Sequence, residues 1–99
     1  MKRLLIHPAA AREAAKAAKY YQLREISLGR SFLMEASVAM EKARCQPLLY
    51  TCLQEDFRRV QLARFPYGVI FRMSDEDTIH IIAVMHLHRE PGYWRDRAD

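Results

Sequence analysis

The hydrophobic positions follow a helical period through the first half of the chain and a strand period through the second. Between residues 9 and 23 the recurring apolar positions are Ala10, Ala14, Ala17 and Tyr21. This spacing predicts a helix whose alanine face lies close to another backbone. A second stripe at the same spacing consists of Phe32, Leu33, Ala36, Met40 and Ala43. We expect Ser27 to cap this second helix, Pro47 to follow its end, and Glu35 and Glu41 to stay on its outer face.

One strand is predicted before the helices and three after them. Residues 4–6 are apolar and are followed by Pro8, a residue favoured in the first turn of a helix. Residues 58–64 alternate between polar and apolar side chains, and residues 67–73 and 78–85 are rich in β-branched and aromatic side chains. Residues 46–55 and 74–77 are expected to be loops, the second a four-residue hairpin loop. The predicted fold is α+β, with the order β-α-α-β-β-β.

The last two predicted strands are apolar on both faces. With Met73 placed opposite Thr78, one face carries Tyr67, Val69 and Phe71, which lie opposite Val84, Ile82 and His80. The other face carries Gly68 and Ile70, opposite Ala83 and Ile81. Two helices can cover only one face of a four-stranded sheet. The second face is therefore covered by the C-terminal segment, covered by residues 46–55, or free to bind a partner.

Length and charge narrow the classes of protein to consider. A chain of 99 residues is expected to form one domain spanning residues 1–99, and its 51% hydrophobic content excludes a disordered protein. Nothing in it is long and apolar enough for a membrane span or a signal peptide, so we expect a cytoplasmic protein with reduced cysteines. The net charge is +4, and residues 1–44 hold nine basic and four acidic residues. This surplus favours an acidic partner.

The residues that could bind a metal or take part in catalysis are histidines, arginines and one tyrosine near the last strand. His80, His86 and His88 share a parity along it, but strand geometry separates His80 from His86 by about 20 Å. We therefore predict no metal site, and no cofactor motif is present in the sequence. Ribonuclease chemistry requires proton-transfer groups and cations around a phosphate, which His86, Arg72, Arg89 and Tyr93 could supply.

The most distinctive stretch is residues 86–95. Pro91 and Gly92 indicate a turn that brings Tyr93 and Trp94 back towards the sheet. Aromatic rings flanked by arginines are typical of interface anchors. The alternative is that Tyr93 and Trp94 cap the hydrophobic core.

The second half of the chain resembles a known toxin family. The segments Arg64-Phe65-Pro66-Tyr67-Gly68-Val69-Ile70-Phe71-Arg72, Ile82-Ala83-Val84-Met85-His86 and Arg89-Glu90-Pro91-Gly92-Tyr93-Trp94, in this order, resemble the RelE/ParE superfamily of type II toxin–antitoxin modules, in particular its ParE-like branch. The resemblance implies the same βααβββ order, in a fold whose helical hairpin packs on a small antiparallel sheet. It also implies a plasmid-stabilisation toxin that poisons DNA gyrase and is neutralised, in a hetero-oligomer, by the acidic amphipathic segment of a cognate antitoxin.

The resemblance also indicates site residues. We expect the target to be bound by Arg72, His86, Arg89, Tyr93, Trp94 and Arg95. We expect the antitoxin to be bound by Arg12, Lys16, Lys19, Tyr20, Tyr67, Val69 and Phe71. No metal, cofactor, membrane or sequence-specific DNA contact is implied.

Two alternatives remain open on the sequence. One is a RelE-like, ribosome-dependent mRNA endonuclease using His86, Arg72, Arg89 and Tyr93, although residues 58–99 contain no lysine of the kind such nucleases present. The other is a degenerate, non-toxic binder of the antitoxin. Residues 47–53 also depart from the family pattern, because they are apolar and lack a glycine turn.

Overall fold

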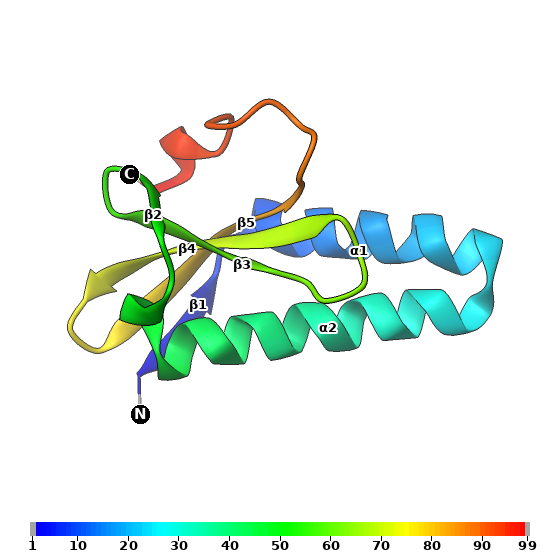
Figure 1. The fold of residues 1–99 in the computed structure, drawn as a ribbon, viewed down its shortest axis with the longest axis horizontal. Coiled ribbons are helices and arrows are strands. Elements are labelled where there is room, and N and C mark those ends of the chain that lie inside the picture. The colour runs from blue at the N-terminus through cyan, green and yellow to red at the C-terminus, as the bar shows by residue number, and fades with distance from the viewer. Residues whose placement is uncertain (1, 99) are drawn as a thin grey trace.

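Two antiparallel helices lie against one face of a five-stranded sheet, and the C-terminal segment lies on the other face (Figure 1). The computed structural model describes residues 2–98. Its helices are α1 (Pro8–Arg24) and α2 (Ile26–Cys45), with 3-10 turns η1 (Pro47–Leu49) and η2 (Arg95–Ala98). Its strands are β1 (Arg3–Ile6), β2 (Cys52–Gln54), β3 (Phe57–Gln61), β4 (Tyr67–Asp75) and β5 (Thr78–His86).

The sheet is mixed, in the order β1-β5-β4-β3-β2. The α+β class and the helical hairpin are confirmed, but the antiparallel prediction is wrong for β1, which pairs in parallel with β5 between Arg3–Ile6 and Thr78–Ile81. The loop prediction for residues 46–55 is also incomplete, because Cys52–Gln54 pair with β3 across a turn at Glu55, whose φ is 51°. A three-residue strand is too short to show an alternating pattern.

The β4–β5 hairpin has a different register from the predicted one. Asp75 pairs with Thr78 and Val69 pairs with Val84, so the connecting turn is shorter than the four-residue loop expected. A bulge next to Ile70 leaves Ile82 as an additional residue in β5. The bulge reverses the alternation of side chains, so His80 and His86 do not share a face.

Each face of the sheet carries its own hydrophobic core. The core under the helices contains Phe32, Val60, Val69, Phe71, Ile79, Ile81 and Val84, together with the alanine face of α1. The core on the outer face contains Phe57, Ile70, Ile82, Ala83, Met85 and Trp94. Of the three alternatives for the second face, coverage by the C-terminal segment is therefore confirmed, and this face is not free to bind a partner. Gly92, with a φ of 90°, provides the turn that returns Trp94 to the sheet.

The connection between the helices is a single residue. Glu25 ends α1 and begins α2 in an extended conformation, with φ −158° and ψ 127°. Ser27 lies in the first turn of α2 and donates a hydrogen bond to Glu25 Oε1 at 3.1 Å, so the prediction that Ser27 caps the helix is wrong. Glu35 is also not on an open face, because its carboxylate accepts hydrogen bonds from the backbone N–H and Nε of Arg64 at 2.9 and 2.6 Å.

Gly29 of α2 lies in close contact with α1, and we expect Gly29→Ala to destabilise the protein. A Cβ at this position would lie 2.9 Å from both the carbonyl oxygen of Ala18 and Cβ of Gln22. Alanine favours a helix over glycine by about 1 kcal/mol, but separating the two backbones costs more, so the net loss should be about 1 kcal/mol. Urea unfolding measures it, with Ser37→Ala on the exposed side of α2 as the control. A variant more stable than the native protein would contradict the close contact.

Candidate functional site

Side chains, in place of a neighbouring strand, cover the last part of one edge of β5. β1 pairs with β5 only as far as Ile81. Beyond this point the backbone N–H of Val84 donates to Glu13 Oε1 at 3.0 Å, and Arg97 Nη1 donates to the carbonyl oxygen of Ile82 at 3.2 Å. Glu13 belongs to α1 and Arg97 to the C-terminal segment, so the two layers of the protein meet around this edge.

Glu13 is the centre of a charged cluster formed by Glu13, Arg89, Tyr93 and Arg97. The Tyr93 hydroxyl donates to Glu13 Oε2 at 2.7 Å, and the Arg97 guanidinium donates to both carboxylate oxygens at 2.8 and 3.1 Å. Arg89 Nη1 lies 3.8 Å from Glu13 Oε2. The guanidinium carbons of Arg89 and Arg97 lie 3.7 and 5.1 Å from the centre of the Tyr93 ring, within range of cation–π attraction.

The surroundings of Tyr93 and Arg97 in the Glu13 cluster raise the pKa of both groups. Burial, followed by the hydrogen bond to Glu13, holds the pKa of Tyr93 far above its ordinary value. The hydrogen bond to Glu13 also raises the pKa of Arg97. Tyr93 is therefore a neutral hydrogen-bond donor at physiological pH. With two guanidiniums around one carboxylate, the cluster carries a net positive charge.

A cleft of about 240 Å³ opens beside the Glu13 cluster. The residues that line this cleft include Lys16, Tyr20, Tyr67, His86 and Arg89. We call it the basic cleft. The Tyr67 and His86 rings lie 5.1 Å apart, and burial raises the pKa of Tyr67, which stays neutral. Nδ1 of His86 accepts the backbone N–H of His88 at 3.1 Å, so the neutral ring carries its proton on Nε2. A carboxylate or phosphate entering this cleft would meet cations and hydrogen-bond donors.

Comparison with known proteins identifies the family. A family model described as the ParE toxin of the type II toxin–antitoxin system, parDE, matches residues 4–91. The chain belongs to the ParE toxin family. The match includes Lys16, His86 and Arg89 of the basic cleft, whereas Tyr93 and Arg97 lie beyond it.

A solved structure shares the ParE fold. A chain described as the chromosomal ParDE TA system from P. aeruginosa superposes with a TM-score of 0.75 at 14% identity, over 88% of this chain and 97% of that chain. No curated protein matches the sequence. The structural likeness supports the α+β architecture of this ParE-family chain, with two helices packed on a mixed sheet.

The residues predicted to bind an antitoxin fall into two groups in this ParE-family protein. Lys16, Tyr20 and Tyr67 line the basic cleft, and the exposed Arg12 and Lys19 extend the positive surface along α1. Val69 and Phe71 are fully buried under the helices. They cannot contact a partner in this conformation, so their assignment is wrong. The error follows from treating their face of the sheet as open.

The residues predicted to bind the target do not form one site. His86, Arg89 and Tyr93 lie together at the basic cleft and the Glu13 cluster. Arg72 is ion-paired with Asp56 at 2.8 Å, and its guanidinium carbon lies 5.3 Å from the centre of the Phe57 ring.

The neighbours Trp94 and Arg95 have different environments. Arg95 is exposed and hydrogen-bonds Gln54 of β2. Trp94 is completely buried, with its ring 4.7 Å from that of Phe57, so it caps the outer core and does not form a target-binding surface.

Glu13 and Arg97 are the residues of the candidate site that sequence reasoning missed. Glu13 lies between alanines in a helix, and Arg97 follows the distinctive motif, so neither is marked by a local pattern. Among residues 2–98, no three His, Cys, Asp or Glu side chains gather as metal ligands would. Within the same part of the chain, neither helix has the length and hydropathy needed to cross a bilayer.

Proposed function

We propose that this ParE-family chain is a cytoplasmic, growth-inhibiting toxin that acts by binding DNA gyrase, and that an acidic segment of a cognate antitoxin neutralises it. The observation that carries the proposal is the basic cleft, where Lys16, His86 and Arg89 lie next to two tyrosines at the junction of α1 and the C-terminal segment. Exposed cations beside aromatic rings are features of protein interfaces that recognise acidic partners.

The charge balance of the helical hairpin supports an acidic antitoxin. Three of its four acidic residues are ion-paired within the protein, namely Glu13 with Arg97, Glu35 with Arg64 and Glu41 with Arg44. Its exposed basic residues are Arg12, Lys16, Lys19, Arg24, Arg30 and Lys42. An acidic, amphipathic segment that folds on this surface would neutralise basic side chains that form no ion pair with another residue between 2 and 98.

The hydrogen bonds at the basic cleft support action by binding. A general base needs an unprotonated nitrogen or oxygen directed at the substrate. Nδ1 of His86 accepts a hydrogen bond from the backbone N–H of His88, and the Tyr93 hydroxyl donates one to Glu13. Nδ1 of His86 and the Tyr93 hydroxyl are thus engaged within the chain, which favours action by binding over proton transfer.

We expect the exposed arginines of the C-terminal segment to contact gyrase. The double variant Arg89→Ala and Arg95→Ala should weaken inhibition of DNA supercoiling by purified gyrase about tenfold, because both charges are lost from the edge of the interface. The exposed Arg3→Ala on β1 is the matched control and should leave inhibition unchanged. The measurement is the concentration that halves supercoiling, with circular dichroism to verify the fold.

Controlled expression in bacteria distinguishes the proposal from its alternatives. Labelling of DNA and protein synthesis in parallel should show DNA synthesis failing first. If protein synthesis fails first and mRNA is cut, the chain is a RelE-like endonuclease and the proposal is wrong. If growth continues unaffected, the chain is a non-toxic binder and the proposal is equally wrong.

A further inference from the structure

Two histidines lie next to each other where β1 pairs with β5. His7 follows β1 directly, and His80 of β5 is the partner of Leu5 in the strand pair. The two rings are stacked, with their centroids 6.1 Å apart and an angle of 29° between their planes. Both side chains are half-buried. Neither residue lines the basic cleft or belongs to the Glu13 cluster, so the proposed function does not involve this histidine pair.

His7 holds the end of β1 and the start of α1 in place through two hydrogen bonds. Its backbone N–H donates to the carbonyl oxygen of Ile81 at 2.9 Å, and its Nδ1 accepts the backbone N–H of Ala9 at 3.0 Å. The second bond makes His7 the N-cap of α1, a position that requires a hydrogen-bond acceptor. A protonated imidazole carries a hydrogen on both nitrogens and is a donor only. Protonation of His7 therefore removes the cap.

The charges that act on the histidine pair are positive. Arg72 of β4 is the cross-strand partner of His80. Burial, followed by the charges of His7 and Arg72, lowers the pKa of His80 from its ordinary value. His7 lies at the N-terminus of α1, where the helix dipole concentrates partial positive charge, and the first turn contains no acidic residue to compensate it. A proton on either ring is therefore opposed by the surroundings of the pair.

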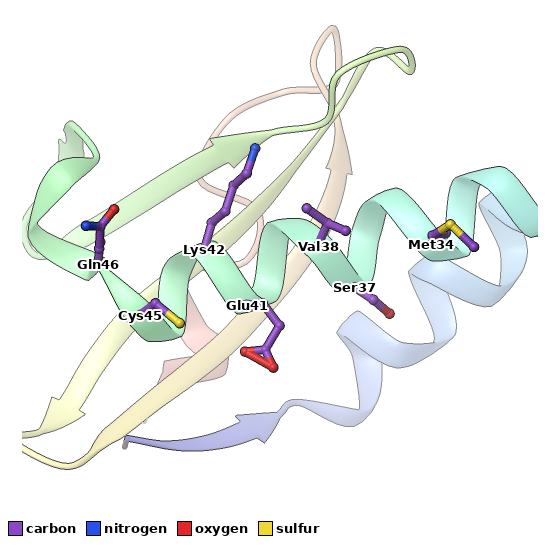
Figure 2. A pocket seen from close by; sticks show the side chains of 7 residues that line it. All are labelled: Met34, Ser37, Val38, Glu41, Lys42, Cys45 and Gln46. Atoms are coloured by element: carbon purple, nitrogen blue, oxygen red, sulfur yellow. The ribbon is translucent and has the colours of Figure 1, made fainter.

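The carboxylates on the surrounding elements are ion-paired with other cations. Asp56, in the turn before β3, lies 2.8 Å from Arg72. Glu13 of α1 is paired with Arg97 of the C-terminal segment. On the helical side of the sheet, Figure 2 shows Glu41 leaving α2 towards β1, and its carboxylate is paired within α2. Among residues 2–98, neither histidine of the pair forms an ion pair with a carboxylate, so no salt bridge within this part of the chain offsets protonation.

We propose that the histidine pair is a pH-sensitive switch that releases β1 from β5 when the protein is acidified. β1 contains four residues and is the outermost strand on its side of the sheet. Its Leu5 and Ile6 side chains are each 43% exposed, so little apolar burial holds the strand in place. Loss of the His7 cap and repulsion between the two rings both act where the strand ends. Release of β1 uncovers the edge of β5 from Thr78 to Ile81.

The direction of the pH dependence follows from the protons that each state binds. His80 binds a proton less readily while β1 is paired, because its pKa is lowered there, than after β1 is released. Release therefore takes up protons and becomes more favourable as the pH falls below about 6.5, the ordinary pKa of histidine. His7 acts in the same direction, since its cap exists only while the ring is neutral. Above this pH the switch keeps β1 in the sheet.

Amide hydrogen exchange of the full chain measures the release. Protection factors are compared at about pH 7.5 and about pH 5.5, on either side of the ordinary histidine pKa. The backbone N–H of His7, which bonds to Ile81, should lose protection at least about tenfold at the lower pH. The amides of Val60 and Val69, which are partners in the β3–β4 pair, are the internal control and should keep their protection. Equal protection of His7 at the two pH values, or an equal loss at Val60 and Val69, would overturn the proposal.

A double variant identifies the histidines as the sensor. In His7→Asn combined with His80→Gln, asparagine remains an N-cap acceptor that does not titrate, and glutamine keeps a neutral polar side chain in β5. This variant should respond to pH at least about fivefold less than the wild type. His88→Asn is the matched control, because His88 is exposed and lies outside the pair, and it should keep the wild-type response. A double variant that still releases β1 at the lower pH would assign the response to other groups and refute the switch.

Nuclear magnetic resonance of the wild-type chain gives a test that needs no variant. The ring of His80 should titrate with a midpoint below about 6.5. The backbone N–H signal of Ala9 should move as the pH falls, because this group loses its acceptor on His7. A His80 midpoint at or above the ordinary value contradicts the switch. None of these measurements depends on toxicity, so a chain that fails to arrest growth overturns the proposed function and leaves the histidine switch unaffected.

Discussion

Trp94→Ala is expected to lower the free energy of unfolding by about 4 kcal/mol, because it removes a fully buried side chain from the outer core. Trp94 packs edge-on against Phe57 with a centroid distance of 4.7 Å, and with Ile70 and Ile82 it forms the hydrophobic cluster on this face. Without the indole, the C-terminal segment loses its main apolar contact. Urea unfolding followed by circular dichroism measures the change.

The same position offers an informative second variant. The indole Nε1 of Trp94 is buried, and within residues 2–98 it has no hydrogen-bond partner. Trp94→Phe removes this unpaired N–H and keeps an aromatic ring, so it should cost much less than Trp94→Ala. The exposed neighbour Arg95→Ala is the control for changes confined to the surface. Equal losses for Trp94→Phe and Trp94→Ala would show that the aromatic contact with Phe57 contributes little.

Glu13→Gln is expected to destabilise the protein by about 3 kcal/mol, although glutamine has nearly the same shape. The substitution removes the negative charge that Arg97 and Arg89 share and weakens the acceptor for the Tyr93 hydroxyl. Partly buried cations left without their carboxylate are costly. Amide hydrogen exchange should also accelerate at Val84, whose N–H donates to Glu13 Oε1.

Two comparisons identify the origin of that loss. Glu90→Gln changes the same charge at an exposed position and should alter stability by less than about 0.5 kcal/mol. In a double-mutant cycle, Arg97→Gln should cost less in the Glu13→Gln background than in the wild type. Additive losses would mean that Glu13 and Arg97 stabilise the fold independently and that the Glu13 cluster is not a unit.

The order of helices and strands was predictable because the apolar residues of each segment recur at the spacing of a helix or of a strand. The alanine stripe of residues 10–17 and the alternation in residues 58–62 arise from local burial, and the corresponding helix and strand lie where the pattern places them. The bulge at Ile82 was not predictable, because an additional apolar residue in an apolar strand changes no visible pattern. Its consequence was a wrong assignment of His80 and His86 to one face.

The candidate site was predictable only in part, because its members come from distant segments. His86, Arg89 and Tyr93 are near each other in sequence, and the motif indicated them together. Glu13 joins them from a position more than seventy residues earlier, through a strand edge that is open only because β1 pairs with β5 no further than Ile81. Trp94 was ambiguous for a different reason, since a large aromatic ring suits an interface and a core equally well.

The pairing of β1 with β5 has a consequence for synthesis of the chain. Residues 3–6 find their partners at residues 78–81, so the strand made first waits for the strand made last. At ordinary translation rates of about 5 to 20 residues per second, this delay is about 4 to 15 s. The helical hairpin, which is joined by one residue, can form during that time from local contacts alone. The nascent protein therefore presents its helices to the cell several seconds before its sheet can be completed.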